Sequence, residues 1–164
     1  MNREILFRGK PDIDQEWLDE MELTLDEHME NLTSVNYKDG FVYGQVVYSG
    51  NQPYIVGEVV ESTDEWITLE YWIPVKPETI GMQTEFIYES LETIYQNDIV
   101  LCEQEGQEPF ISAVEWDKDG FTVSDNHGKH PLRSFDITDP FLRPQPKIRK
   151  VGNIHDNPEL LEVE

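Results

Sequence analysis

The sequence predicts an α+β fold whose sheet structure is mainly antiparallel and barrel-like. Several short runs rich in β-branched and aromatic residues are separated by tight-turn signals, a pattern typical of antiparallel strands. One acidic segment near the N-terminus instead carries apolar residues at helical spacing. The 164 residues suffice for a single domain, and 7 Phe, 7 Tyr and 4 Trp indicate folding despite a formal net charge of −22.

The first predicted element is a short strand, Arg3–Arg8, with Ile5 and Phe7 on one face. An acidic helical insertion follows over about residues 12–33, with an aspartate as its N-cap. Its apolar residues recur at helical spacing and share one stripe: Leu18, Met21, Leu25, Met29 and Leu32. Because the outer face is rich in carboxylates, this helix must rely on tertiary packing.

A first β block is predicted from three runs, residues 41–48, 54–60 and 66–73. In the third run, apolar residues alternate with polar or mixed ones. The alternation predicts a half-buried strand whose apolar face consists of Ile67, Leu69, Tyr71 and Ile73. Pro74 then ends regular strand pairing.

Residues 85–95 have the spacing of a short helix with Ile87, Leu91 and Ile94 on one side. A second β block is predicted over about residues 98–125. Its hairpin loop is Asp117-Lys118-Asp119-Gly120, in which the glycine supplies a positive φ. The block comprises runs 98–102, 110–116 and 121–125.

The C-terminal arm spans residues 139–164. Its first part, residues 139–150, is proline-rich and is expected to run extended over a surface. It concentrates Arg143, Lys147, Arg149 and Lys150, with Phe141 and Leu142 as apolar anchors. Residues 157–161 carry the signal of a short C-terminal helix, with Asn as the cap and Pro at the first helical position.

Acidic charge is unevenly distributed. Residues 11–37 contain nine Asp or Glu and no Lys or Arg, and residues 49–116 contain fourteen acids and one base, Lys76. This polarity predicts self-association, in which the basic arm docks on an acidic face of its own subunit or of a neighbour. It disfavours direct binding of nucleic acid or anionic membranes, which require positive surfaces. A basic protein is the other partner class that the charge suits.

Compartment signals are few. No apolar run is long enough to span a bilayer, and the first ten residues lack the apolar stretch of a signal peptide. The single cysteine, Cys102, cannot form an internal disulfide, which fits a reducing cytosol. The expected location is therefore cytoplasmic.

Candidate chemical motifs are incomplete. Asp117–Gly120 starts like a calcium loop, but Phe121 and Gly128 occupy positions that need oxygen ligands. His127 and His130 lack the further ligands that zinc requires. The nucleophile-elbow, P-loop and dinucleotide motifs are absent. The sequence therefore predicts no catalytic residue, no metal and no cofactor, and it names no binding residue.

Five segments nevertheless resemble one family. Residues 3–10 (REILFRGK) resemble REIKFRGK, residues 73–81 (IPVKPETIG) resemble IPVDPETVG, and residues 94–100 (IYQNDIV) resemble IYEGDIV. Residues 113–116 (AVEW) and 151–161 (VGNIHDNPELL) complete the match, in the same order along nearly the whole chain. These are segments of the YopX-type proteins of bacteriophages and prophages. The resemblance implies a phage or prophage accessory protein that is homo-oligomeric and lies in the bacterial host cytosol. With it, the basic partner becomes a basic host or phage protein, and no catalytic residue is transferred.

The chain departs from that family pattern in three places. The acidic insertion after Lys10 replaces a shorter connection, residues 83–93 replace a Gly-Leu-Lys-Asp-like turn, and Asn97 stands where glycine is common. Three functions stay open. The expected one is a non-enzymatic, oligomeric protein-interaction module. The alternatives are an acidic nucleic-acid mimic that inhibits a host nucleic-acid-binding protein, and an enzyme with an unrecognised carboxylate site.

Overall fold

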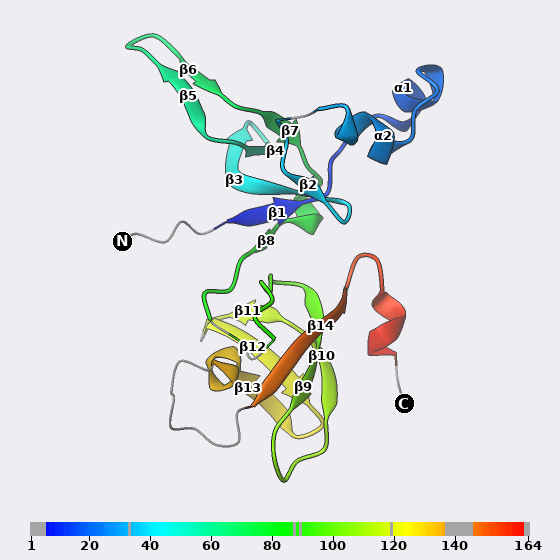
Figure 1. Cartoon of the computed structure of the whole chain (residues 1–164), viewed down its shortest axis with the longest axis vertical. Coiled ribbons are helices and arrows are strands. Elements are labelled where there is room, and N and C mark those ends of the chain that lie inside the picture. The colour runs from blue at the N-terminus through cyan, green and yellow to red at the C-terminus, as the bar shows by residue number, and fades with distance from the viewer. Residues whose placement is uncertain are drawn as a thin grey trace. The chain divides into compact units, whose positions relative to one another are not determined.

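The computed structural model describes residues 6–32, 34–86, 88, 90–118, 120–136 and 146–162. The chain divides into two compact units, Met1–Met82 and Gln83–Glu164 (Figure 1). Strands account for 45% of the structure and helices for 16%, and the strand pairs are antiparallel, which confirms the mainly antiparallel prediction. The described strands form four separate sheets that close no barrel, so the barrel-like prediction is wrong.

The N-terminal unit is built on a six-stranded sheet in the order β7-β4-β3-β1-β8, with β2 also paired to β3. A two-residue turn at Gly50 and Asn51 joins β3 to β4, and Gly50 supplies the positive φ of 63°. The strands are β1 (Phe7–Gly9), β2 (Tyr37–Lys38), β3 (Phe41–Ser49), β4 (Gln52–Val56), β7 (Trp72–Pro74) and β8 (Gly81–Met82). The predicted N-terminal strand is thus present, while residues 3–5 lie outside the described residues.

The acidic insertion forms two six-residue helices, α1 (Gln15–Glu20) and α2 (Leu25–Glu30), so the prediction of one continuous helix is wrong. Glu22 adopts a left-handed φ of 58°, and Leu23 N donates to Leu18 O at 3.0 Å to close the first helix. A capping box, Thr24 with Glu27, then starts the second. This break leaves Met21 54% exposed, although Leu18 and Met29 are buried.

Buried side chains from the sheet and from α2 form the core of the N-terminal unit: Met29, Val42, Ile55, Ile73 and Val75. Beside it, Arg8 is fully buried with its guanidinium 4.2 Å from the centroid of the Phe41 ring. The two short helices also touch, because the Trp17 and His28 rings pack edge-on with centroids 5.0 Å apart.

The hairpin of β4 and β7 continues outward as a second, two-stranded sheet of β5 (Val59–Ser62) and β6 (Ile67–Leu69) (Figure 1). Each of the runs 54–60 and 66–73, predicted as one strand, is therefore interrupted and split between the two sheets. A register shift between Val59 and Glu61 marks a bulge in β5. We call residues 58–70 the ribbon.

The C-terminal unit contains two three-stranded sheets, ordered β10-β9-β14 and β11-β12-β13. The predicted hairpin at Asp117–Gly120 is confirmed, since Asp117 pairs with Gly120 and the glycine has φ 103°, while Asp119 lies outside the described residues. The strands are β9 (Asp98–Glu103), β10 (Phe110–Ala113), β11 (Glu115–Asp117), β12 (Gly120–Asp125), β13 (Gly128–Pro131) and β14 (Lys147–Asn153). The two sheets meet where Ser124 N donates to Ser112 Oγ at 2.8 Å.

Aliphatic and aromatic side chains from both sheets and the connecting segments form the core of the C-terminal unit: Tyr88, Ile94, Val100, Cys102, Val114, Val123, Leu132, Phe135 and Ile148. Tyr88 shares a 2.6 Å hydrogen bond with Thr84, whose hydroxyl donates to Ile94 O at 2.7 Å. Burial raises the pKa of Tyr88 above its ordinary value.

The predicted helix at 85–95 does not form in the described residues. Leu91 has a left-handed φ of 59° and is 78% exposed, whereas Ile94 is buried. Instead the segment folds back on itself, and Thr84 N donates to Ile94 O at 2.8 Å. Ile87 lies outside the described residues. Just beyond, Asn97 has φ 74°, a left-handed conformation that glycine adopts most easily and that asparagine tolerates better than most other residues.

The C-terminal arm docks within its own unit over its described part. Residues 147–153 form β14, an edge strand paired with β9, and therefore an integral part of the sheet. Arg143, Phe141 and Leu142 lie outside the described residues. The C-terminal helix is present as a 3-10 helix, Pro158–Leu161, with proline in its first turn.

Candidate interaction surface

The ribbon exposes large apolar side chains. Every residue from 58 to 68 is exposed. Four large apolar residues stand out: Val59 is 55% exposed, Val60 62%, Trp66 54% and Ile67 62%. A half-buried strand was predicted here, but burial along its apolar face ends between Ile73, which is 7% exposed, and Ile67. The ribbon therefore presents on its surface the residue types that normally form a core.

Local contacts hold the base of the ribbon. Tyr71 lies over Gly57, where an added Cβ would come within 2.7 Å of the ring, so only glycine allows this packing. The Tyr71 hydroxyl donates to Tyr43 O at 2.6 Å, and burial raises the pKa of Tyr71. Gly57 N donates to Tyr71 O at 2.9 Å and Glu70 N to Glu58 O at 2.8 Å, so the hairpin ladder continues into the ribbon.

The tip of the ribbon is also organised. Thr63 Oγ1 accepts hydrogen bonds from Glu65 N at 3.2 Å and from Trp66 N at 3.1 Å. Thr63 N donates to Trp66 O at 2.8 Å, which closes the loop. These bonds hold the backbone of Trp66 next to β6, so the exposed indole is presented from a structured turn.

The apolar surface continues onto the main sheet. Trp72, 65% exposed, stacks on Tyr54 with centroids 5.3 Å apart and an interplanar angle of 26°. Tyr54 pairs in register with Val47, which is 47% exposed. Paired residues lie on one face of a sheet, so these three side chains lie together opposite the core.

Negative charge surrounds the ribbon's apolar residues. The ribbon contains five carboxylates, and no Lys, Arg or His occurs between residues 39 and 75. The five are Glu58, Glu61, Asp64, Glu65 and Glu70. The backbone bond from Glu70 to Glu58 sets these two residues opposite each other across the strands, a like-charge arrangement that destabilises an isolated ribbon.

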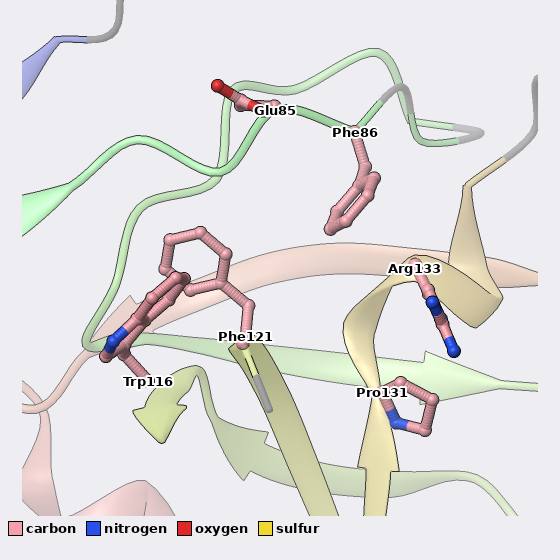
Figure 2. A pocket seen from close by; sticks show the side chains of 7 residues that line it. Glu85, Phe86, Trp116, Phe121, Pro131 and Arg133 are labelled. Carbon is pink, nitrogen blue, oxygen red and sulfur yellow. The ribbon is translucent and has the colours of Figure 1, made fainter. Parts of the chain in front are cut away.

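A separate, concave feature lies in the C-terminal unit. It is a half-open cavity of 240 Å³ with mostly apolar walls (Figure 2). Trp116 and Phe121 pack edge-on on one side with centroids 4.7 Å apart, and Phe86 and Arg133 lie across from them. Pockets that enclose a drug-sized ligand have volumes of about 300–1,000 Å³. This cavity suits a single side chain instead.

The predicted histidine loop is a hydrogen-bonded turn. His130 Nε2 lies 2.8 Å from Asp125 Oδ2, while His127 N and Gly128 N donate to Asp125 Oδ1 at 2.7 and 3.0 Å. The bond from the His127 amide, followed by that from the His130 side chain, lowers the pKa of Asp125. Within the described ranges, no three His, Cys, Asp or Glu side chains come together as a metal site would require.

Two buried ionisable groups serve the packing of β9. Burial raises the pKa of the Cys102 thiol to about 12, so the reactive thiolate is scarce at neutral pH. Asp98 is fully buried; its Oδ2 accepts from Tyr95 N at 2.8 Å and its Oδ1 lies 3.4 Å from Lys150 Nζ. One of the arm's four cations is thus engaged inside its own subunit.

Sequence reasoning missed the ribbon because hydrophobic alternation reports which side of a strand is apolar, not whether anything covers it. The sequence signal that could have indicated the exposed ribbon was a strand-like run that contains many carboxylates and no cations.

In the part of the chain that the structure describes, no helix is long and apolar enough to cross a membrane.

Comparison with known proteins places the chain in a family. No curated protein matches it. A family model described as YopX protein matches residues 6–162, nearly the entire chain. This family has no established activity, and membership suggests a phage-type protein. The resemblance of the five sequence segments is thereby confirmed, and the chain belongs to the YopX family.

Proposed function

We propose that the protein is a non-enzymatic, oligomeric interaction module of the phage type, acting in the bacterial cytosol, and that the ribbon is its contact surface. The observation that carries the proposal is the exposure of Val59, Val60, Trp66 and Ile67 on a structured hairpin. Large apolar side chains that are exposed together on one segment, and not scattered singly over the surface, commonly mark interaction sites on soluble proteins. Tryptophan is moreover enriched among the residues that dominate binding energy.

The non-enzymatic part of the proposal rests on the sequence, which lacks the phosphate-binding and nucleophile motifs. A cytosolic setting agrees with the buried, unreactive Cys102. A basic host or phage protein is the second partner class that the ribbon's carboxylates would suit.

Light scattering coupled to size exclusion tests the role of the ribbon. We expect the wild type to exceed the 19.2 kDa of one chain at micromolar concentration, and the double variant Trp66→Ser/Ile67→Ser to return to that mass. The matched control is Trp17→Ser/Met21→Ser, because Trp17 and Met21 are 40% and 54% exposed outside the ribbon. A wild type that stays at one chain, or a control as disruptive as the ribbon variant, would contradict the proposal.

The ribbon's five carboxylates keep the nucleic-acid mimic as the alternative function. A mimic binds through charge, so Glu58→Gln/Glu61→Gln/Asp64→Asn/Glu65→Gln would abolish binding to a basic nucleic-acid-binding protein while Trp66→Ser would leave it intact. The interaction module predicts a large loss from Trp66→Ser.

A further inference from the structure

The ribbon needs a partner that matches both its charge and its apolar surface. Each of its strands pairs only with the other among the described residues, so both outer edges are open. Open strand edges invite pairing with another chain. Two ribbons would place their carboxylates against each other, which is unfavourable. The occupant must therefore be cationic and partly apolar.

Such a face exists on the C-terminal unit. In the register of β14, β9 and β10, Arg149 pairs with Leu101 and Leu101 pairs with Ile111. Ile148 and Cys102, one position along, belong to the core, so the Arg149 row faces the opposite side. Arg149 and Lys147 are exposed, and Ile111 is 40% exposed. We call Lys147, Arg149, Leu101 and Ile111 the basic face.

The outer edge of β14 borders the basic face and is partly occupied. Lys150 N donates to the carboxylate of Glu92 at 2.8 Å, away from β9. Because backbone groups alternate along a strand, the amide of Ile148 points to the same side, on which no described strand pairs with β14. Two acids oppose the match: Glu92 lies at this edge, and Glu103 pairs with Lys147 in register and offsets part of its charge.

We propose that the ribbon of one copy docks on the basic face of a second copy, with carboxylates meeting Lys147 and Arg149 and apolar residues meeting Ile111 and Leu101. The inference rests on the proposed self-assembly through the ribbon and names its receiving surface. Where the contact is reciprocated, two copies form a closed two-fold dimer that uses both surfaces of each copy. Where it is not reciprocated, each copy of a pair keeps one unused surface, and the assembly closes as a ring or extends as a filament.

Ionic strength decides the conditions of the test. Each copy has a formal charge of −22, so copies repel at long range in dilute buffer. Near 0.15 M salt the Debye length is about 8 Å, and only groups close to contact interact strongly. The measurements therefore belong at about this ionic strength.

The experiment is sedimentation velocity on two one-sided variants and their mixture. Trp66→Ser/Ile67→Ser removes the ribbon surface, and Lys147→Glu/Arg149→Glu removes the basic face. Each variant alone should sediment as one chain of 19.2 kDa. Their equimolar mixture should yield a two-chain species and nothing larger, because a single intact pair of surfaces remains.

Controls separate this inference from the proposed function. Lys118→Glu/Arg133→Glu makes the same charge change at exposed sites of the same unit and should leave the assembly intact. Glu103→Gln should strengthen it severalfold. Circular dichroism checks that each variant is folded. If Lys147→Glu/Arg149→Glu does not fold, Lys147→Gln/Arg149→Gln takes its place, because it removes the two positive charges without reversing them. If only the ribbon variant disrupts the assembly, or the mixture stays at one chain, the basic face is wrong although the interaction role stands. A wild-type monomer overturns both.

Discussion

Two hairpins of similar composition differ in how far their apolar side chains are buried. The ribbon and the β11–β12 hairpin each combine acids, β-branched residues and a tryptophan that is 54% exposed, Trp66 in one and Trp116 in the other. The second hairpin gains β13 as a third strand, and its Val123 is fully buried. The ribbon has no third strand among the described residues, and its Ile67 is 62% exposed.

The difference shows that a strand-forming sequence does not by itself bury its apolar face. In the β11–β12 hairpin, Trp116 packs on Phe121 at 4.7 Å and Lys129 forms a 3.1 Å ion pair with Asp117. In the ribbon, the cross-strand neighbours Glu58 and Glu70 have the same charge. The first hairpin is stabilised within its own unit, whereas the ribbon's apolar residues remain available to a partner.

The largest expected contrast is between two isoleucines. Ile148→Ala should lower the free energy of unfolding by about 2–5 kcal/mol, because the side chain is 1% exposed in the core beneath β12. Ile67→Ala should change it by less than about 0.5 kcal/mol in the monomer. Urea denaturation at low protein concentration measures both. Equal losses would mean that another part of the chain covers the ribbon.

Alanine substitutions of the two tryptophans should differ less in their effect on stability. Trp116→Ala removes an edge-to-face pair with Phe121, an arrangement that contributes about 0.5–1.5 kcal/mol beyond area burial. Trp66→Ala removes no such ring contact among the described residues and should leave monomer stability nearly unchanged. Thermal melts under monomeric conditions decide the comparison, which fails if Trp66→Ala is the more damaging of the two.

Charge substitutions should change stability in opposite directions in the ribbon and in the sheet that contains the β11–β12 hairpin. Lys129→Ala breaks an exposed ion pair and should cost about 0.2–1 kcal/mol, less at high salt. Glu70→Lys replaces a like-charge cross-strand pair by an opposite one and should stabilise the ribbon by a similar amount, about 0.2–1 kcal/mol. Denaturation at low and high NaCl measures both. A destabilising Glu70→Lys would show that Glu70 is already compensated.

The smallest effect concerns acid pH. The His127 amide and His130 side chain lower the pKa of Asp125 below its ordinary 3.8. The stabilisation is therefore complete above pH 3.8 and is lost as the pH falls through the lowered pKa. NMR titration of the Asp125 carboxyl should show this, and Asp125→Asn should flatten the acid limb of stability. A titration at the ordinary value would contradict it.

Local rules predicted the turns and several strands correctly. Gly50 lies at positive φ within the loop between β3 and β4, and Gly120 has positive φ directly after the loop between β11 and β12. At both positions glycine avoids the steric cost of a Cβ. The structure starts a second helix with the capping box of Thr24 and Glu27, whereas the regular apolar stripe across these residues predicted one long helix. Leu23 N bonding back to Leu18 O ended that helix at Glu22 instead.

The sequence by itself determined the β-rich class, the hairpin turns and the separation of acids from cations. These depend on backbone sterics and on charges already present along the chain. Only the tertiary structure decided that residues 147–153 pair with β9, that Ile73 is buried while Ile67 is exposed, and that the candidate site lies on the ribbon. The physical reason is that burial requires a second surface within reach. Periodicity marks the apolar face of a strand, whereas packing between distant segments determines whether that face is covered.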